Sequence, residues 1–284
     1  MLSIAVPVRT PTRVAALFRT GAIAIATLPV PAAMAQSVLD DFSSGNDTAW
    51  TRFDGNLTVL GVPSTFALVG GGYRISSPSV PNPGFEPIIS SVRADAINAD
   101  AVISVDITDW SGPVNTGLIA RGQVDLSFYL VYFTPVSVLA PNSSNFSIVR
   151  YNAAPGSGVL NRTVLGGGTP FPQVDQQHDY RIVMNQTGSL IQATLVDITT
   201  ATVVRSVTVI DEWTGSFQVS GVAGVSMYSN DNSGNSMLAP FSVTFDNFRV
   251  DSARAVCFGN ANGDTRVDFS DLTEVLAQFG NTCP

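Results

Sequence analysis

Hydrophobic and polar residues alternate with a period of two over much of the chain between Val38 and Val250. In the segments 101–108 and 180–185, every second side chain is apolar. Because successive side chains of a strand point to opposite faces, this pattern predicts strands that bury one face. The segments 126–133 and 203–210 are more continuously apolar, and they too are predicted to be strands.

Turn-forming clusters separate these segments. Runs rich in Gly, Pro, Asn and Ser occur at 70–72, 81–84, 111–113, 155–158, 166–168 and 229–236. No helical periodicity longer than a turn or two appears between them. About a dozen short strands at this spacing predict one all-β domain over residues 37–252, folded as an antiparallel two-sheet sandwich around a single core.

The first 35 residues have the pattern of a targeting segment. Arg9, Arg13 and Arg19 precede a short apolar run, prolines follow, and Ala33-Met34-Ala35 fits the small-x-small pattern of a signal-peptidase site. The apolar run is shorter than the roughly 20 residues that span a bilayer. We therefore expect residues 1–35 to be a signal peptide, and the mature protein to be secreted or at the cell surface, without a membrane span.

The charge balance excludes some functions. All 14 basic residues are arginines, against 22 acidic residues, and removal of residues 1–35 leaves a net charge of −11. Nucleic-acid binding is not expected, because no basic patch is present to neutralise phosphates. The only histidine, His178, precedes Asp179 without a Gly-x-Ser-x-Gly motif. We interpret this pair as the entry to a strand and not as a catalytic pair.

Two stretches at the ends of the β domain carry a family resemblance. The opening Leu39-Asp40-Asp41-Phe42-Ser43-Ser44-Gly45, followed by Trp50, and the closing segments 221–228 and 241–250 resemble the first and last strands of secreted concanavalin A-like (laminin-G-like) domains. The resemblance implies a jelly-roll sandwich in which the first and last strands pair.

The closing stretch also predicts local geometry. Its apolar residues change from odd to even positions. Phe241, Val243 and Phe245 have odd numbers, whereas Phe248 and Val250 have even numbers. A bulge near Asp246-Asn247 would keep all five on the core face. Gly221 and Gly224 are predicted to permit a close approach of neighbouring backbones.

An enzymatic function is the weaker interpretation. Glycosidases use two carboxylates placed on either side of the scissile bond. The three glutamates, Glu86, Glu212 and Glu274, do not pair with another acid at a strand spacing of two or four. Asp106 and Asp109 are three residues apart, which predicts opposite faces of a strand. An extracellular glycoside-processing enzyme with acids from loops stays the alternative function, and the sequence leaves enzymatic activity undecided.

Carbohydrate binding is the favoured interpretation. Trp110 and Trp213 lie beside turn residues, so they are predicted to stand at the rim of the sandwich, where an indole ring can stack on a sugar. Trp50, Tyr129 and Tyr132 are further candidates, and packing in the core is the competing interpretation for each. A structural surface protein without a small ligand is a third possibility.

Residues 256–284 contain an oxygen-rich loop followed by apolar residues at helical spacing. Counted from Asn260, side-chain oxygens fall at positions 1, 3, 5, 9 and 12, and position 7 offers a backbone carbonyl. The predicted Ca²⁺ ligands are Asn260, Asn262, Asp264, Arg266 (through its carbonyl), Asp268 and Asp271. This is the spacing of an EF-hand loop, because Ca²⁺ takes six to eight oxygen ligands. A polar loop that binds no metal is the alternative.

This segment resembles a single repeat of a dockerin, the calcium-binding module of secreted bacterial proteins. The matching residues are Asn262-Gly263-Asp264, Val267-Asp268, Asp271-Leu272, Val275-Leu276 and Phe279-Gly280. The resemblance implies attachment to a cohesin-like partner or to the cell surface. Cys257 and Cys283 bracket the segment, and we expect them to form a disulfide because export permits one.

Overall fold

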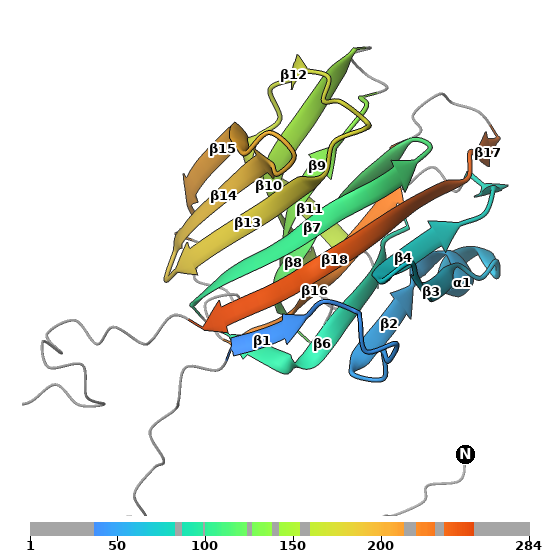
Figure 1. Cartoon of the computed structure of the whole chain (residues 1–284), viewed down its shortest axis with the longest axis horizontal. Helices are drawn as coiled ribbons and strands as arrows, with labels where there is room; N and C mark the ends of the chain where they lie inside the picture. Colours follow the sequence, from blue (N-terminus) through green and yellow to red (C-terminus); the bar gives the residue numbers. More distant parts are fainter. Residues whose placement is uncertain are drawn as a thin grey trace, which may run out of the picture. The chain divides into compact units, whose positions relative to one another are not determined.

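In the computed structural model, the chain forms two antiparallel sheets and almost no helix (Figure 1). The structure describes residues 37–82, 87–98, 100–123, 127–137, 142–153, 160–212, 220–230 and 236–252. The predicted all-β antiparallel two-sheet sandwich is confirmed. Among the residues described, no helix is long and apolar enough to cross a membrane.

The first sheet, sheet A, has the strand order β15-β14-β13-β7-β18-β4-β3, and β1 pairs with the second half of β18. Its strands are β1 (Ser37–Asp40), β3 (Thr65–Val69), β4 (Gly72–Ser77), β7 (Ala101–Ser111), β13 (Tyr180–Thr187), β14 (Leu190–Asp197), β15 (Thr202–Ile210) and β18 (Phe241–Ser252). The pairing of β1 with β18 confirms that the first and last strands of the domain lie together.

The second sheet, sheet B, has the order β11-β10-β9-β8-β16-β6-β2, and β12 pairs with β10. Its strands are β2 (Trp50–Asp54), β6 (Ile89–Asn98), β8 (Val114–Gly122), β9 (Phe128–Thr134), β10 (Ser143–Ala153), β11 (Leu160–Gly167), β12 (Phe171–Pro172) and β16 (Gly221–Ser229). A short pair, β5 (Val80–Pro81) with β17 (Met237–Leu238), and one helix, α1 (Gly55–Leu60), complete the described part.

One apolar core fills the space between the sheets. Inward positions alternate along each strand, as at Ile103, Val105 and Ile107 of β7 and at Val131 and Phe133 of β9. All of these side chains are buried, and the core joins residues of both sheets in one cluster. Burial of this apolar surface is the main favourable contribution to folding.

The predicted bulge in β18 is present. Asp246 lies opposite Asp106 and Arg249 opposite Ser104, so β18 has one residue more than β7 between these pairs. Asn247 takes a left-handed backbone conformation with a φ of 49°. The five apolar residues of β18 are consequently all buried: Phe241, Val243, Phe245, Phe248 and Val250.

A second bulge, in β7, corrects two predictions. Asp109 lies opposite Thr244 and Ile107 opposite Phe245, so Thr108 is an extra residue that reverses the alternation. Trp110 therefore turns inward, is only 8% exposed and packs against Phe133 and Tyr180. The prediction of an exposed rim position for Trp110 was wrong. Asp106 and Asp109 share the outer face of β7, so their predicted separation was also wrong.

The two glycines of β16 permit the predicted close approach. A Cβ atom on Gly224 would lie 2.2 Å from the carbonyl oxygen of Ser91. On Gly221 it would lie 2.5 Å from the carbonyl carbon of Arg121. Both distances are far shorter than a van der Waals contact. Because the neighbouring atoms belong to the backbone and cannot move aside, glycine is required at these positions.

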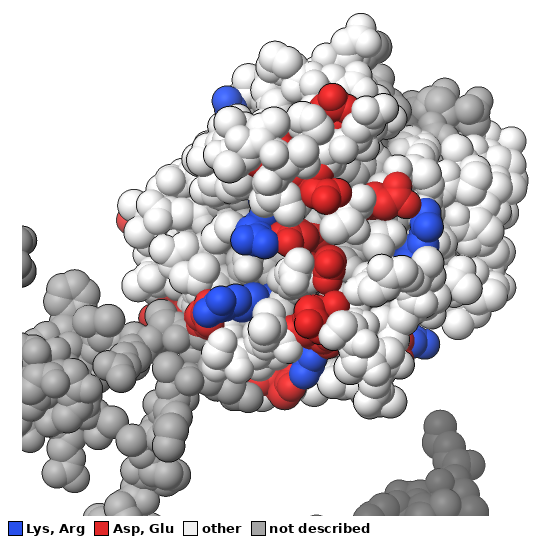
Figure 2. All heavy atoms as spheres, viewed as in Figure 1, with Lys and Arg blue, Asp and Glu red and all other residues white. Residues whose placement is uncertain are grey.

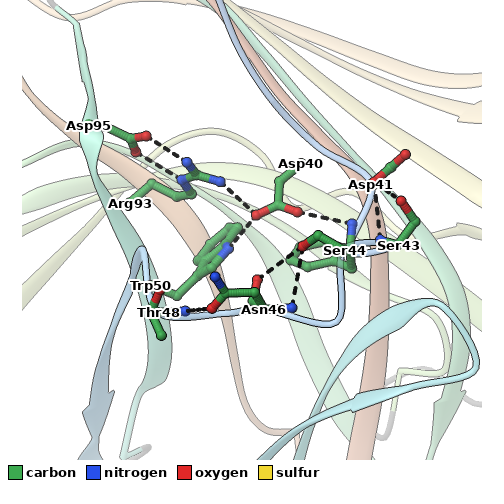
Figure 3. Close-up of polar contacts among 10 residues, drawn as sticks. Asp40, Asp41, Ser43, Ser44, Asn46, Thr48, Trp50, Arg93 and Asp95 are labelled. Atoms are coloured by element: carbon green, nitrogen blue, oxygen red, sulfur yellow. Dashed lines mark hydrogen bonds and ion pairs between the residues drawn. The ribbon is translucent and has the colours of Figure 1, made fainter.

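The opening motif ties β1 of sheet A to β2 and β6 of sheet B (Figure 3). One oxygen of Asp40 accepts hydrogen bonds from the Trp50 indole N–H, at 2.8 Å, and from the Arg93 guanidinium, at 2.6 Å. The other oxygen accepts from the backbone N–H of Phe42, at 2.9 Å. Arg93 also pairs with Asp95, and this pairing lowers the pKa of the Asp95 carboxyl. The residues that carry the family resemblance therefore join the two sheets.

We predict that Asp40→Ala lowers the free energy of unfolding by about 3 kcal/mol, because Arg93 and the Trp50 N–H lose a largely buried partner. Asp109→Ala is the matched control. It removes an exposed ion pair with Arg74 and is expected to cost less than about 1 kcal/mol. Urea denaturation of both variants measures the difference, and equal losses would contradict this role of Asp40.

Candidate functional site

A network of buried polar side chains lies at one end of the sandwich. At this end β8, β10 and β15 finish and β9, β11 and β16 begin. Its buried polar residues include Arg121, Tyr129, Arg150 and Asp211. Because a polar group without a partner is costly to bury, these side chains need defined hydrogen bonds.

Asp211, just after β15, is the centre of the network. Its carboxylate oxygens accept from the Tyr129 hydroxyl at 2.7 Å and from the Arg150 guanidinium at 2.6 and 2.7 Å. Burial, followed by the hydrogen bond to Asp211, raises the pKa of Tyr129, so the phenol keeps its proton and donates it. These contacts join β9 and β10 of sheet B to the end of β15 in sheet A.

Arg121 forms a second bridge between the sheets. Its guanidinium donates to Asp100 at 3.1 Å and to the carbonyl oxygen of Gly188 at 2.9 Å, and it lies 6.0 Å from the centroid of the Tyr129 ring. Asp100 also accepts from the backbone N–H of Gly188, at 2.8 Å. Arg121 has a positive φ of 50° where the register between β8 and β16 shifts. This irregularity is the local cause of its inward orientation.

The network anchors the chain and does not resemble a catalytic centre. Arg121 is paired with Asp100, and Arg150 with Asp211. Carboxylates held in this way are committed to structural partners, whereas an acid–base pair needs one group able to exchange a proton with substrate. The arrangement can hold in place the points at which the chain enters and leaves these strands.

The aromatic candidates that the structure describes are packed in the interior. Trp50, Trp110, Tyr129 and Tyr132 are buried. Trp213 follows Asp211 by two residues and lies outside the described residues. The calcium ligands Asn260, Asn262, Asp264, Arg266, Asp268 and Asp271, together with Cys257 and Cys283, also lie outside them.

Acidic side chains gather on the outer face of sheet A (Figure 2). Asp106 and Asp246 are directly opposite each other on β7 and β18. Asp106 accepts from Arg181 at 2.6 and 2.8 Å and from the Asn247 side chain at 3.0 Å. Burial raises the pKa of Asp246, and the negative charges of Asp106, Asp41 and Asp179 raise it further. This is the place in the described structure where two carboxylates face each other across neighbouring strands.

Sheet B has the opposite character. Five adjacent strands, β11, β10, β9, β8 and β16, contain no aspartate or glutamate. Their outer face carries a second apolar cluster that includes Phe128, Tyr132, Tyr151 and Tyr228. At its edge, Arg162 donates to the Tyr132 hydroxyl at 2.9 Å. These rings are almost fully buried, and the strands of this face supply no carboxylate for acid–base chemistry.

His178 stands at the entry to β13, as the sequence predicted. Its Nδ1 lies 2.7 Å from the Asp197 carboxylate and its Nε2 lies 3.8 Å from Asp175. The hydrogen bond to Asp197 raises the pKa of His178 above 6.5, and the charges of Asp197 and Asp175 act in the same direction. The imidazole therefore fastens the turn before β13 to the end of β14.

No family model matches the sequence, and no curated protein matches it. Among solved structures, the carbohydrate-binding module CBM66 from Bacillus subtilis is 18% identical, with 73% of this chain and 98% of that chain covered and a TM-score of 0.45. LamAcat from Zobellia galactanivorans is 9% identical, with coverages of 76% and 96% and a TM-score of 0.49. A xylan β-1,4-xylosidase from Bacillus halodurans is 16% identical, with coverages of 75% and 39% and a TM-score of 0.45. At these identities the similarity concerns the fold alone.

We predict that His178 titrates above its unfolded value of 6.5, and that Asp197→Asn lowers its pKa. Because the folded pKa is the higher one, the contribution of His178 to stability is fully present below the unfolded pKa and is lost as the pH rises through the folded pKa. The chain has a single histidine, so its ring protons can be followed by NMR without ambiguity. A His178 pKa unchanged by Asp197→Asn would show that the contact is absent in solution.

Proposed function

We propose that the protein is a secreted, non-catalytic carbohydrate-binding protein that binds sugar at the end of the sandwich where the buried network lies. The observation that carries the proposal is the fixation of Asp211 by Tyr129 and Arg150, two residues before Trp213. A tryptophan close to a fixed point of the chain loses little entropy on binding, and its apolar ring with one polar atom suits a sugar ring.

The charge of the chain defines the class of sugar. The mature protein carries a net charge of −11, so acidic polysaccharides are repelled at long range. Five adjacent strands of sheet B contain no carboxylate, and the aromatic rings on their outer face are buried. The net charge favours neutral polysaccharides, which are bound by stacking and hydrogen bonds.

A glycoside-processing enzyme is the second candidate function. It is favoured by Asp106 and Asp246, which face each other on the outer side of sheet A. Arg181 pairs with the Asp106 carboxylate, and burial raises the pKa of Asp246, so the two acids have different environments. Such a difference is what separates an acid from a base or nucleophile in these enzymes. The direct partners of Asp106 on two neighbouring strands, Arg181 of β13 and Asn247 of β18, favour a structural role instead.

The proposal includes the two ends of the chain. Residues 1–35 would direct export, and residues 256–284 would bind Ca²⁺ and attach the protein to a cohesin-like partner or to the cell surface. The support is the spacing of six oxygen ligands and the resemblance to a dockerin repeat. Cys257 and Cys283 would close the module with a disulfide outside the cell.

We predict that the mature chain binds neutral polysaccharides on an array, and that Trp213→Ala reduces binding at least about tenfold by removing the stacked ring. The unfolding midpoint of this variant should stay unchanged. Trp110→Phe is the control, because Trp110 belongs to the core and its replacement should affect stability but not binding. Release of new reducing ends, abolished by Asp246→Asn, would favour the enzyme over the binding protein.

We predict that the mature chain binds one Ca²⁺ with a dissociation constant of about 10⁻⁵ to 10⁻³ M, the range of extracellular sites with few acidic ligands. Calorimetry should show that Asp264→Ala together with Asp268→Ala abolishes the heat of binding. Asp246→Ala, which removes an acid from sheet A, should leave it unchanged. Binding that persists in a chain ending at Ser252 would contradict the assignment.

A further inference from the structure

Residues 173–179 form a strap that joins β12, beside sheet B, to β13 of sheet A. The first half of the strap is held by β10 and the residue before it. The backbone N–H of Gln173 donates to the carbonyl oxygen of Asn142 at 3.2 Å. The backbone N–H of Val174 donates to the Ser144 hydroxyl at 3.0 Å, and the Val174 side chain belongs to the core. All these groups are neutral, so this half of the strap has no charge that depends on pH.

The second half of the strap is attached to the turn between β14 and β15. His178 Nδ1 lies 2.7 Å from the carboxylate of Asp197, the last residue of β14. The backbone N–H of Asp179 donates to the Thr199 hydroxyl at 2.9 Å, and its carbonyl oxygen accepts from the Ile198 N–H at 3.0 Å. The strap is therefore attached to sheet A through a few contacts next to one imidazole ring.

The charged groups that act on His178 are acidic. The hydrogen bond to Asp197 raises the pKa of His178, and the charges of Asp197, Asp175 and Asp179 act in the same direction, against a smaller effect of burial. Asp197 comes from β14, whereas Asp175 and Asp179 belong to the strap itself. The protonated imidazole therefore compensates three carboxylates, and the neutral imidazole leaves them to repel one another.

The first two residues of β13 do not change their charge near neutral pH. Burial raises the pKa of Tyr180 to about 12, so the phenol keeps its proton and donates to the carbonyl oxygen of Asp175 at 3.0 Å. Arg181 is paired with Asp106 on the outer face of sheet A. Because His178 is the only histidine of the chain, it is the side chain expected to titrate in this range.

The aromatic group beside the strap contains a buried donor that is not paired. The ring of Tyr180 packs on those of Trp110 and Phe133, at centroid distances of 5.7 and 5.6 Å. Within the described residues, the Trp110 Nε1 atom is buried and has no hydrogen-bond partner. Water would satisfy this N–H, so opening this end of the core costs less than opening one where every donor is paired.

We propose that the strap is a pH-sensitive switch: its second half is attached to sheet A while His178 is protonated and detaches when the imidazole loses its proton. Because the folded pKa of His178 is above the unfolded value of 6.5, the attachment is complete below 6.5 and is lost as the pH rises through the folded pKa. Val174 keeps its neutral contact with Ser144, so the strap opens at one end and gives water access to Tyr180 and Trp110.

Hydrogen exchange of the mature chain at about pH 5.5 and about pH 8.5, on either side of the titration range of histidine, tests the proposal. The Ile198 amide reports the attachment, because it donates to the carbonyl oxygen of Asp179. After correction for the intrinsic exchange rate, its protection should fall about threefold or more at the higher pH, the size expected for a partly exposed ion pair. Protection of the Val174 amide should change less than about twofold, because its partner is neutral.

His178→Gln separates the charge from the hydrogen bond. Glutamine can still donate to Asp197 but is never charged, so the fall in Ile198 protection between the two pH values should disappear. Asp109→Asn, which removes an exposed carboxylate of β7 outside the strap, is the matched control and should keep the fall. Circular dichroism checks that both variants fold. The proposal is overturned if Ile198 protection in the unmodified chain does not depend on pH, if the fall persists in His178→Gln, or if β3 and β4 lose protection equally.

Discussion

Buried arginine–aspartate pairs that cross from one sheet to the other determine how this sandwich is put together. Arg93 with Asp40 joins β6 to β1, and Arg150 with Asp211 joins β10 to the end of β15. The chain has no lysine, and the planar guanidinium can satisfy several acceptors at once where an ammonium cannot. Removing one partner leaves a buried charge unpaired. The free-energy cost of that unpaired charge exceeds the net stabilisation by the pair, so each pair strongly constrains the relative placement of the sheets.

The comparison of β18 with β7 shows how far alternation predicts strand geometry. The bulge at Asp246-Asn247 was predictable, because apolar residues on both sides of it change parity and only a bulge keeps them in the core. The bulge at Thr108 was not predictable, because a single apolar residue, Trp110, follows it. Strict alternation accounted for the strand up to that point, and the inward turn of Trp110 depends on pairing with a strand more than 100 residues away in the chain.

The buried network was predictable only in part, because its members come from separate segments of the chain. Arg150 has the same parity as Phe146 and Ile148, which places a charge on a core face and requires a buried partner. The sequence pattern does not identify that partner. Asp211 has the appearance of a turn residue, and only the packing of β15 against β10 brings it to Arg150. The sequence therefore indicates that such a network exists, and the topology decides its composition.

The distribution of charge bears on the ligand proposed for this protein. Acids lie on the outer face of sheet A, whereas the strands of sheet B from β11 to β16 have none. Under the proposed function, an acidic protein gains no long-range attraction from a neutral polysaccharide, so the proposal requires binding groups that are already in position. Preorganisation depends on rigid attachment of the binding segment to the sheets. The contacts of Asp211 with Tyr129 and Arg150 fix the chain just after β15, and the proposed function rests on the position of Trp213 two residues later in the sequence.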